Sequence, residues 1–427
     1  MPIERPESNL LSEWLIYIDS INAKSIELGL DRVRRVKESC NLNPNFPVII
    51  VAGTNGKGSS CKLLESILFE AGYKVGCYTS PHIYSFNERI CINKTSLEED
   101  LIVSSIKFIE ENRNNIPLTY FEITTLAAMN LMIKSNVDIA ILEVGLGGRY
   151  DAVNVFEPQI SLLTSVGIDH QDYLGDTLEE IGYQKAGIFR SNKDAIVNLD
   201  NPPSSVLGYA EEIKANVSIK GIDFRVERKK DSFDYFGSGT HIADLPYPYL
   251  LGAHQIDNAT GVLRCIELLP QHFNIKKKSI ENGLVSCELP GRIEIIAQHP
   301  MVLADVSHNP EASLKLFNFL SEFKNNGKVY AVFSILSDKN IEGVIAPFLN
   351  LVDEWFIATI NSSRARPAGE IQQSIKNEKP DAVIHIKDNL KEAYQNAFEK
   401  SLLNDNIVLF GSFYTVSECL TKINTNG

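Results

Sequence analysis

The sequence predicts an α/β protein with two sheets: a mainly parallel sheet in the N-terminal part and a Rossmann-like α/β arrangement in the C-terminal part. Three observations predict this class. A length of 427 residues is enough for two or three domains. Residues 48–51 form a β-branched run, typical of a strand buried on both faces, and a glycine-rich turn and a helical pattern follow it. From Met301 onward, strand-like and helix-like segments alternate, as in a doubly wound sheet.

The glycine-rich turn has the layout of a phosphate-binding loop. Glycines let backbone N–H groups close on phosphate oxygens, and the following helix N-terminus adds partial positive charge. Lys57 can neutralise the β- and γ-phosphates. The standard motif differs, because Gly58 separates Lys57 from Ser59 and Val51 stands where a glycine is usual; a plain glycine turn is the alternative. We expect a P-loop ATPase domain whose nucleotide contacts come from Thr54, Asn55, Gly56, Lys57, Gly58 and Ser59.

Composition limits the classes of function. A hydrophobic content of 44% is ample for real cores, and a formal net charge of −13 argues against a general nucleic-acid binder. The seven cysteines form no C-x-x-C pair, which is typical of reduced thiols. The N-terminus has no apolar signal core, and no apolar run approaches a membrane span. We expect a cytoplasmic monomer that binds small molecules and neither nucleic acid nor membrane.

Helices are predicted over residues 9–45 and from Thr119 to Ile133. The first region is short for an independent domain. Glu122 lies at the capping-box offset from Thr119, which is sufficient to explain a plain helix start. Residues 218–251 have the pattern of short strands and turns, and a further helix begins after Gly252.

Polar side chains follow three more predicted strands of the N-terminal part. Ser80 follows strand 74–78, Glu143 ends strand 138–143, and Asp169-His170 follow strand 160–166. Oxygen ligands beside a phosphate loop are well placed to hold Mg²⁺, which keeps several waters. Each also has a simpler interpretation: a turn serine, an isolated strand-end acid and a structural histidine. Lys185, in a helix predicted over 176–189, is by itself a surface lysine.

The segment Leu289-Pro290-Gly291-Arg292 indicates a domain boundary, because Pro and Gly end the preceding helix. We expect a first domain over 1–290 that binds ATP, magnesium and a substrate, a hinge over 291–299, and a C-terminal domain over 300–427. Ligands of open α/β sheets bind beyond the carboxyl ends of strands.

The first C-terminal strand delivers such a segment, residues 305–310. Asp305 is expected to accept hydrogen bonds from ribose hydroxyls, His308 to lie by the nucleotide, and Arg292 to reach the ATP phosphates. Arg364 and Arg366 could pair with a carboxylate substrate, or be solvated loop arginines.

The compact segment Gly-Thr-Asn-Gly-Lys-Gly-Ser resembles one family, the folylpolyglutamate synthases and dihydrofolate synthases, relatives of the Mur amino-acid ligases. Similar segments occur over nearly the whole chain. They are Ser-Ile-Glu-Leu-Gly-Leu at 25–30, Lys-Ala-Gly-Ile at 185–188, Asp-Val-Ser-His-Asn-Pro at 305–310 and Gly-Ser-Phe-Tyr-Thr-Val at 411–416.

The resemblance implies roles for particular residues. Two magnesium ions would share Ser80, Glu143 and His170. Lys185 would be carbamylated by CO₂ and give a carboxylate-like oxygen to the metals, so that Lys57, His170 and Lys185 form the catalytic set. Asn258 would contact adenine, and a monovalent cation is a further candidate cofactor. The pterin pocket would be lined by Leu28, Thr119, Phe121, Asp151 and Ala152.

The resemblance also implies an activity: an ATP-dependent ligase that joins L-glutamate to dihydropteroate, giving dihydrofolate, and to folates, through an acyl phosphate. A monofunctional folylpolyglutamate synthase is the first alternative. Another Mur-type ligase is a second, although the short N-terminal region argues against a peptidoglycan-type enzyme. A protein that uses ATP only to change shape is the third.

Overall fold

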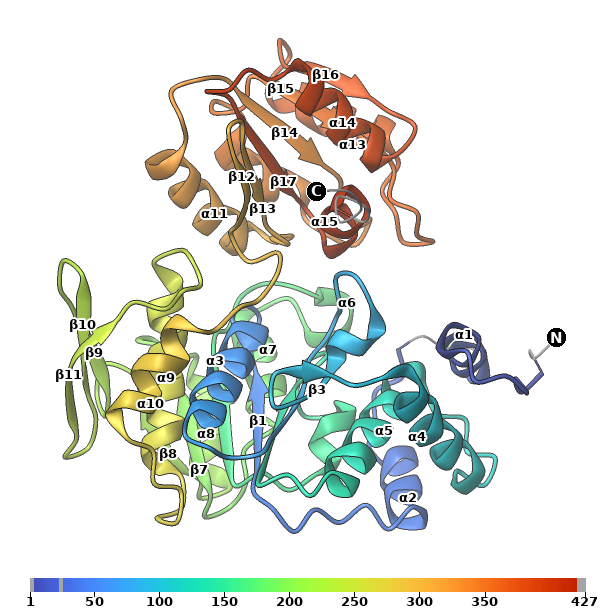
Figure 1. Cartoon of the computed structure of the whole chain (residues 1–427), viewed down its shortest axis with the longest axis vertical. Helices are drawn as coiled ribbons and strands as arrows, with labels where there is room; N and C mark the ends of the chain where they lie inside the picture. The colour runs from blue at the N-terminus through green and yellow to red at the C-terminus, as the bar shows by residue number, and fades with distance from the viewer. Residues whose placement is uncertain (1–3, 23–25, 421–427) are drawn as a thin grey trace. The chain divides into compact units, whose positions relative to one another are not determined.

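The structure is a computed structural model that describes residues 4–22 and 26–420 (Figure 1). The chain forms two compact units. The first contains the residues up to 249 together with 256–287, and the second contains residues 250–255 and those from 288 onward. Each unit is organised around its own main sheet.

The main sheet of the first unit has eight strands within the described residues. In spatial order they are β4 (Thr95–Ser96), β3 (Ile90–Ile92), β2 (Val75–Tyr78), β5 (Ile139–Glu143), β1 (Val48–Ala52), β6 (Ile160–Leu163), β7 (Asp194–Val197) and β8 (Asn216–Ile219). From β2 to β8 all neighbours are parallel, and β3 and β4 add an antiparallel edge. The predicted mainly parallel sheet is therefore confirmed.

Helices cover both faces of this sheet (Figure 1). They are α1 (Leu11–Ile21), α2 (Asp31–Ser39), α3 (Lys57–Glu70), α4 (Glu99–Asn112), α5 (Tyr120–Lys134), α6 (Gln171–Leu174), α7 (Leu178–Ala186), α8 (Ser204–Glu212), α9 (His254–Leu268) and α10 (Lys277–Val285), with 3₁₀ turns η1 (Phe86–Arg89) and η2 (Ala152–Val155). The single helix predicted over 9–45 is wrong, because residues 26–30 are not helical and divide it into α1 and α2. Residues 23–25, including Ser25 of the segment at 25–30, lie outside the described residues.

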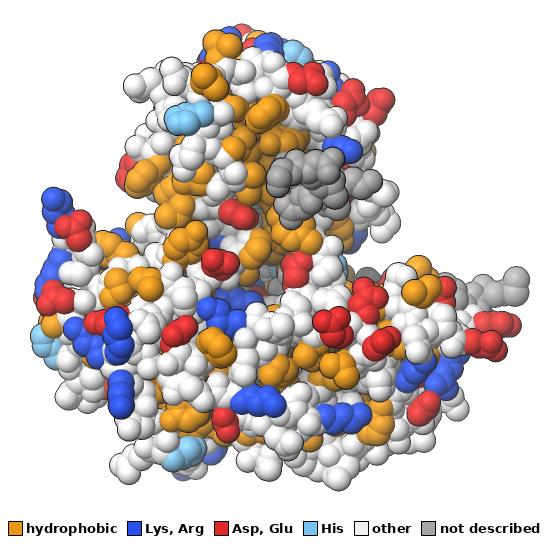
Figure 2. Space-filling view, viewed as in Figure 1, with side chains coloured by type: hydrophobic (Ala, Val, Ile, Leu, Met, Phe, Trp, Pro, Cys, Tyr) orange, Lys and Arg blue, Asp and Glu red, His pale blue; other side chains and the backbone are white. Residues whose placement is uncertain are grey.

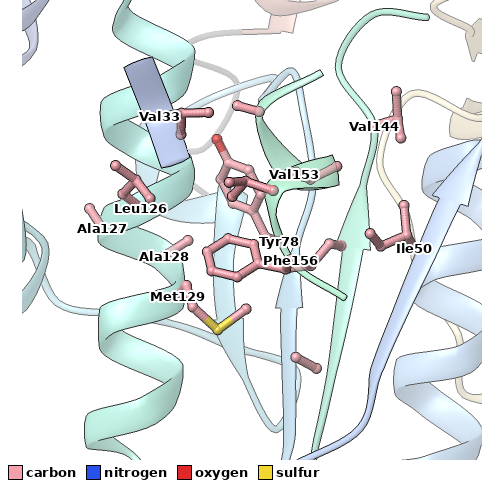
Figure 3. Close-up of a cluster of buried hydrophobic side chains, with 14 of the residues drawn as sticks. Val33, Ile50, Tyr78, Leu126, Ala127, Ala128, Met129, Val144, Val153 and Phe156 are labelled. Carbon is pink, nitrogen blue, oxygen red and sulfur yellow. The ribbon is translucent and has the colours of Figure 1, made fainter. Parts of the chain in front are cut away.

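The core on one face of the sheet lies beneath α2 and α5. Ile50 of β1 and Tyr78 of β2 point into it, together with Val33 of α2 and the run Leu126–Met129 of α5 (Figure 3). Because side chains alternate along a strand, Ile49 and Val51 of β1 are buried on the opposite face, the face of α3. A strand covered on both faces needs apolar residues throughout, which explains the unbroken run at 48–52.

A separate three-stranded antiparallel sheet completes the first unit. Its order is β11 (His241–Pro246), β10 (Ser232–Phe236) and β9 (Arg225–Arg228). It confirms the short strands predicted between residues 218 and 251, and the Gly237–Gly239 turn joins β10 to β11.

The second unit has a six-stranded sheet within the described residues. Its order is β12 (Glu294–Gln298), β13 (Met301–Ala304), β17 (Asn406–Phe410), β14 (Val329–Phe333), β15 (Glu354–Ile357) and β16 (Val383–Ile386). The strands from β13 to β16 are parallel, as predicted, and β12 is antiparallel to β13. The helices are α11 (Pro310–Phe323), α12 (Ile341–Ile345), α13 (Ala368–Glu378), α14 (Leu390–Lys400) and α15 (Phe413–Leu420), with the 3₁₀ turn η3 (Ala346–Phe348).

Two features of the second unit differ from the expectation. Residues 291–299, expected as a hinge, include β12, whose residues pair with β13 and so belong to the sheet. Their half-buried side chains leave only a weak apolar pattern in the sequence. Helix α13 was not predicted at all. Its apolar positions Ile371 and Ile375 are separated by polar residues, so the helical pattern is sparse.

Acidic and basic side chains are interspersed over the face of the molecule drawn in Figure 2. Within residues 4–22 and 26–420, every helix is too short or too polar to cross a membrane.

Candidate functional site

The phosphate-type loop joins β1 to α3 and is braced by the segment that follows β6. The Thr54 N–H donates to the Ser165 carbonyl at 3.0 Å, and the Asn55 N–H donates to the Ser165 hydroxyl at 2.8 Å. The Thr164 hydroxyl donates to the Asn55 carbonyl at 2.7 Å. The strand predicted over 160–166 is too long: β6 ends at Leu163, and the next two residues, Thr164 and Ser165, bond to the phosphate-type loop.

Lys57 is the first residue of α3, and its side chain folds over the loop. Its Nζ donates to the carbonyls of Gly53 and Thr54 at 2.9 and 3.1 Å. The ammonium therefore lies at the centre of the loop, where a phosphate-binding loop presents its lysine. Gly58 and Ser59 are buried in the first turn of α3.

Gly56 ends the loop in the left-handed conformation, with φ of 84°. A Cβ at this position would lie 2.4 Å from Oδ1 of Asn258, a residue of α9. The loop and α9 therefore meet at Gly56, which places the predicted adenine contact beside the predicted phosphate contacts. A side chain at position 56 would disturb both.

Ser80 and Glu143 are brought together because β2 and β5 are neighbours in the sheet. The Ser80 N–H donates to Glu143 Oε2 at 2.9 Å, and the Glu143 side chain is buried. Because β6 ends earlier than predicted, His170 does not follow the strand directly but precedes the first residue of α6. Its backbone has φ of 54°, and its N–H donates to Asp169 Oδ1 at 2.9 Å. In the part of the chain that the structure describes, no three His, Cys, Asp or Glu side chains gather as they would around a fully protein-ligated metal.

Lys185 is buried in the last turn of α7 and is not the surface lysine that its sequence context suggests. Among the described residues it has no hydrogen-bond or ion-pair partner for its ammonium. Burial and the nearby charge of Lys57 lower the pKa of Lys185 to about 7, against the opposing influence of Asp169 and Asp151. An amine with this pKa is substantially neutral at physiological pH.

Asp151 organises the glycine-rich loop that follows β5. Its carboxylate accepts hydrogen bonds from the N–H groups of Leu146 and Val153 at 2.8 and 3.0 Å. Burial nevertheless raises the pKa of Asp151 to about 7. The adjacent Ala152 is buried and begins η2.

Phe121 and Thr119 lie at the N-terminus of α5. The Phe121 ring lies against Gly145 of the same glycine-rich loop, since a Cβ there would come within 2.7 Å of the ring. The capping box predicted at Thr119 is confirmed: the Glu122 N–H donates to the Thr119 hydroxyl, and the Thr119 N–H donates to the Glu122 carboxylate. Leu28, in the segment before α2, is 39% exposed and accessible to a ligand.

In the second unit the predicted nucleotide contacts lie at the carboxyl end of β13. Asp305 is buried, and its two oxygens accept the N–H groups of Ile293 and Ser307, both at 2.8 Å. Burial raises the pKa of Asp305. The Arg292 guanidinium and the His308 ring both lie beside the ring of Phe413, with the guanidinium 5.0 Å from its centroid. Each Asp305 oxygen keeps a lone pair for a further donor.

Arg364 and Arg366 bond within the second unit. Arg364 pairs with Asp338 at 2.8 Å, and Arg366 donates to the carbonyls of Ser337 and Lys339. These bonds join the loops that follow β14 and β15.

Sequence reasoning missed several residues of the site. Thr164 and Ser165 brace the phosphate loop, Asp169 contacts His170 and influences Lys185, and Phe413 lies against Arg292 and His308. Asp169 follows a predicted strand, a position that many turn residues share, and Thr164 and Ser165 fall inside the strand predicted over 160–166, so the sequence did not mark them as loop contacts.

The chain is thus a two-unit α/β protein with a glycine-rich, lysine-bearing loop between β1 and α3. Residues 51–266 match the Mur ligase middle domain, and residues 291–413 match the Mur ligase, glutamate ligase domain. A dihydrofolate synthase/folylpolyglutamate synthase from Haemophilus influenzae is 35% identical and covers 96% of each chain. The one from Escherichia coli is 36% identical, over 97% of this chain and 95% of the relative.

Solved structures agree with these relatives. The structure of E. coli FolC in complex with DHPP and ADP has a TM-score of 0.90 and 36% identity, and covers 95% of this chain and 96% of that one. A bifunctional folylpolyglutamate synthase/dihydrofolate synthase with Mn, AMPPNP and L-glutamate bound has a TM-score of 0.87 and 35% identity, over 95% and 96% of the two chains. The chain belongs to the dihydrofolate synthase/folylpolyglutamate synthase family.

Proposed function

We propose that this chain is an ATP-dependent ligase that joins L-glutamate to dihydropteroate, forming dihydrofolate, and to folates, extending their glutamate tails. The observation that carries the proposal is the grouping of Lys57, Ser80–Glu143 and Lys185 around one phosphate-type loop, in a chain similar over its whole length to bifunctional relatives. The alternative within the family is a folylpolyglutamate synthase that does not add glutamate to dihydropteroate. The two are distinguished by whether the protein uses dihydropteroate as an acceptor.

The chemistry requires activation of a carboxylate, because oxide is a poor leaving group. The acceptor carboxylate attacks the γ-phosphorus of ATP, releasing ADP and giving an acyl phosphate. The amine of glutamate then attacks the acyl carbon, phosphate leaves, and the amine proton is lost. Lys57 and the loop N–H groups would offset the charge that builds on the phosphoryl oxygens.

A divalent cation, Mg²⁺ in the cell, fits the donors present. The Ser80 hydroxyl and the buried Glu143 carboxylate offer oxygen ligands, and Mg²⁺ usually completes its shell with waters and nucleotide phosphates and not with a full protein cage. The relative with Mn and AMPPNP bound supports a nucleotide–metal pair. When bound, the metal would supply charge neutralisation at the phosphates. His170 is the proposed contact to a second ion, and a monovalent cation stays a candidate.

Lys185 is proposed to carry a carbamate. A neutral lysine amine attacks CO₂, forming the N–C bond and losing a proton, and the product is a carboxylate-like group. Burial beside Lys57 with no anionic partner within bonding distance supports this, because a carbamate would replace two close positive charges by an ion pair. Lys185→Ala should lose activity and regain part of it with added short carboxylates such as acetate. Failure of every small carboxylate to rescue a folded variant would argue against the carbamate.

The remaining assignments are those that the sequence and its resemblance to the family imply. Asn258 is the proposed adenine contact, and Arg292, Asp305 and His308 are proposed nucleotide contacts of the second unit. Leu28, Thr119, Phe121, Asp151 and Ala152 are the proposed pterin contacts. All seven cysteines are buried free thiols, which supports a reducing, cytoplasmic location. We expect a monomer without nucleic-acid or membrane partners.

The decisive experiment measures phosphate release with ATP, Mg²⁺ and glutamate while dihydropteroate or tetrahydrofolate is added in turn. Release with each acceptor, only when glutamate is present, is the expected result. Release with tetrahydrofolate but none with dihydropteroate would reduce the function to a folylpolyglutamate synthase. Tight nucleotide binding without glutamate-dependent release would instead favour a nucleotide-driven switch.

A further inference from the structure

Arg32, on the first turn of α2, joins three segments of the first unit. Its Nη1 lies 3.0 Å from Glu27 Oε1, and its Nη2 donates to the Glu27 carbonyl at 2.9 Å. The same Nη2 donates to Glu122 Oε1 at 2.9 Å. One guanidinium thus ties the segment before α2 to the N-terminus of α5, 90 residues away.

Both partners of Arg32 have second anchors. The Glu27 carboxylate also accepts a hydrogen bond from Asn22 Nδ2, which in turn donates to the Pro117 carbonyl. The Glu122 carboxylate is the reciprocal half of the Thr119 capping box. The segment at 26–30 is therefore linked to the start of α5 at two places: through Arg32 to Glu122 in the first turn, and through Asn22 to Pro117 just before the helix.

The fastened segments are those that carry the proposed acceptor contacts. Leu28 is next to Glu27, Phe121 is next to Glu122, and Thr119 is bonded to Glu122 directly. Phe121 continues the connection to Gly145 of the glycine-rich loop. The Arg32 cluster thus fixes the distance between two walls of one proposed pocket.

Stability alone is a poor reason for this cluster. The side chain of Glu122 is 95% buried and that of Arg32 is 79% buried. Removing such charges from water costs free energy, and apolar side chains of the same size would often stabilise the fold as well or better. The gain of such a cluster is fixed geometry, because a guanidinium holds carboxylates in its own plane. Without the cation, two carboxylates would face each other and push the segment at 26–30 away.

We propose that Arg32 is a positioning residue for the acceptor substrate: by bridging Glu27 and Glu122 it holds Leu28 opposite Phe121 and so sets the affinity for the pterin-bearing acceptor. This rests on the proposed function, since it concerns the same acceptor pocket. It requires no contact between Arg32 and the substrate. The proposal predicts that loss of Arg32 weakens the use of the acceptor and leaves the use of ATP and glutamate nearly unchanged.

The test compares Arg32→Met with Arg34→Met. Arg34 lies on the same helix, but its pairing with Asp31 is largely exposed, so it is a matched control. Arg32→Met should raise KM for dihydropteroate about tenfold or more, because it removes two charge-assisted bonds. KM for ATP and glutamate should stay within about twofold of wild type, as should every constant of Arg34→Met. Adding Glu27→Gln to Arg32→Met should recover part of the acceptor KM by removing the repulsion.

Hydrogen–deuterium exchange gives a readout that needs no turnover. Amides at 26–30 and 119–122 should exchange faster in Arg32→Met than in Arg34→Met. If the wild-type protein releases no phosphate with any acceptor, the proposed function fails. The exchange comparison of Arg32→Met with Arg34→Met still shows whether Arg32 holds the two segments together. Should Arg32→Met not fold, Glu27→Gln removes only the anion on the 26–30 side and is expected to act in the same direction. An unchanged acceptor KM together with a lowered melting temperature would overturn the proposal and leave Arg32 a structural role alone.

Discussion

Replacing Gly56 by alanine tests the junction of the phosphate loop with α9. Two costs are expected. A non-glycine residue at φ of 84° costs about 1–2 kcal/mol. In addition, the new Cβ would lie 2.4 Å from Asn258 Oδ1 and 3.2 Å from its Cγ, so the amide must move, at a cost of about 1–3 kcal/mol. Gly56→Ala should therefore lower the free energy of unfolding by about 2–5 kcal/mol.

A second glycine separates the two costs. Gly72, just after α3, has φ of 89°, but a Cβ there would meet nothing within 4 Å. Gly72→Ala should thus show the backbone cost alone. In the Gly56→Ala/Asn258→Ala double variant the obstructing amide is absent, so the two substitutions should be less destabilising together than the sum of the singles, by about 1 kcal/mol or more.

Urea unfolding of the four variants and wild type gives these free energies, and calorimetric titration with a non-hydrolysable ATP analogue gives the affinity. Because Asn258 is the proposed adenine contact, Gly56→Ala should weaken nucleotide binding and Gly72→Ala should not. Equal losses of stability in Gly56→Ala and Gly72→Ala, or additivity of the cycle within about 0.5 kcal/mol, would show that Asn258 does not lie against the loop.

Three further predictions concern charges around the loop. Lys57→Ala should lower turnover by about 100-fold or more, with Lys74→Ala as a control on the same unit, and near-wild-type turnover in a folded variant would refute its phosphate role. Glu143→Ala should shift the Mg²⁺ titration of activity to higher concentration while affinity for adenosine changes little; an unchanged titration would remove Glu143 from the metal site. Burial raises the pKa of Asp151 from 3.8 to about 7, so the folded chain keeps a proton that the unfolded chain loses, and this contribution to stability, present below pH 3.8, is lost as pH rises through about 7. Asp151→Asn should abolish that slope in urea unfolding between about pH 4 and 7, and an identical slope in both proteins would contradict the raised pKa.

Local patterns were sufficient for most elements of the fold. The run at 48–52, the glycine turn and the stripe of α3 are consecutive, so their order could be predicted without knowledge of the rest of the chain. The capping box at Thr119 and Glu122 was predictable for the same reason, since its two partners are three residues apart. Positions such as Ser80 and Glu143 could be proposed for the site because parallel strands end at one edge of a sheet.

Contacts between distant segments were not predictable. The brace from Ser165 to Asn55 joins residues 110 apart, and the bond from Arg32 to Glu122 joins residues 90 apart. Neither leaves a periodic trace, because hydrogen bonds between loops place no constraint on the residues around them. The burial of Lys185 is of this kind: its helix has polar neighbours in sequence, and only the tertiary packing of α7 covers its amine.

Strand insertion explains how both sheets assemble their polar edges. In the first sheet β5 lies between β2 and β1, although it follows both in the chain, and this places Glu143 beside Ser80. In the second sheet β17, the last strand of the described chain, lies between β13 and β14. The Gly411 N–H consequently donates to the Ser307 carbonyl, and the Thr415 hydroxyl donates to the Ser334 carbonyl. A late strand inserted between two earlier ones joins their loops at the carboxyl edge, where ligands of open α/β sheets bind. Since insertion order is a property of packing and not of local pattern, the residues at these edges can be proposed from sequence, but their partners cannot.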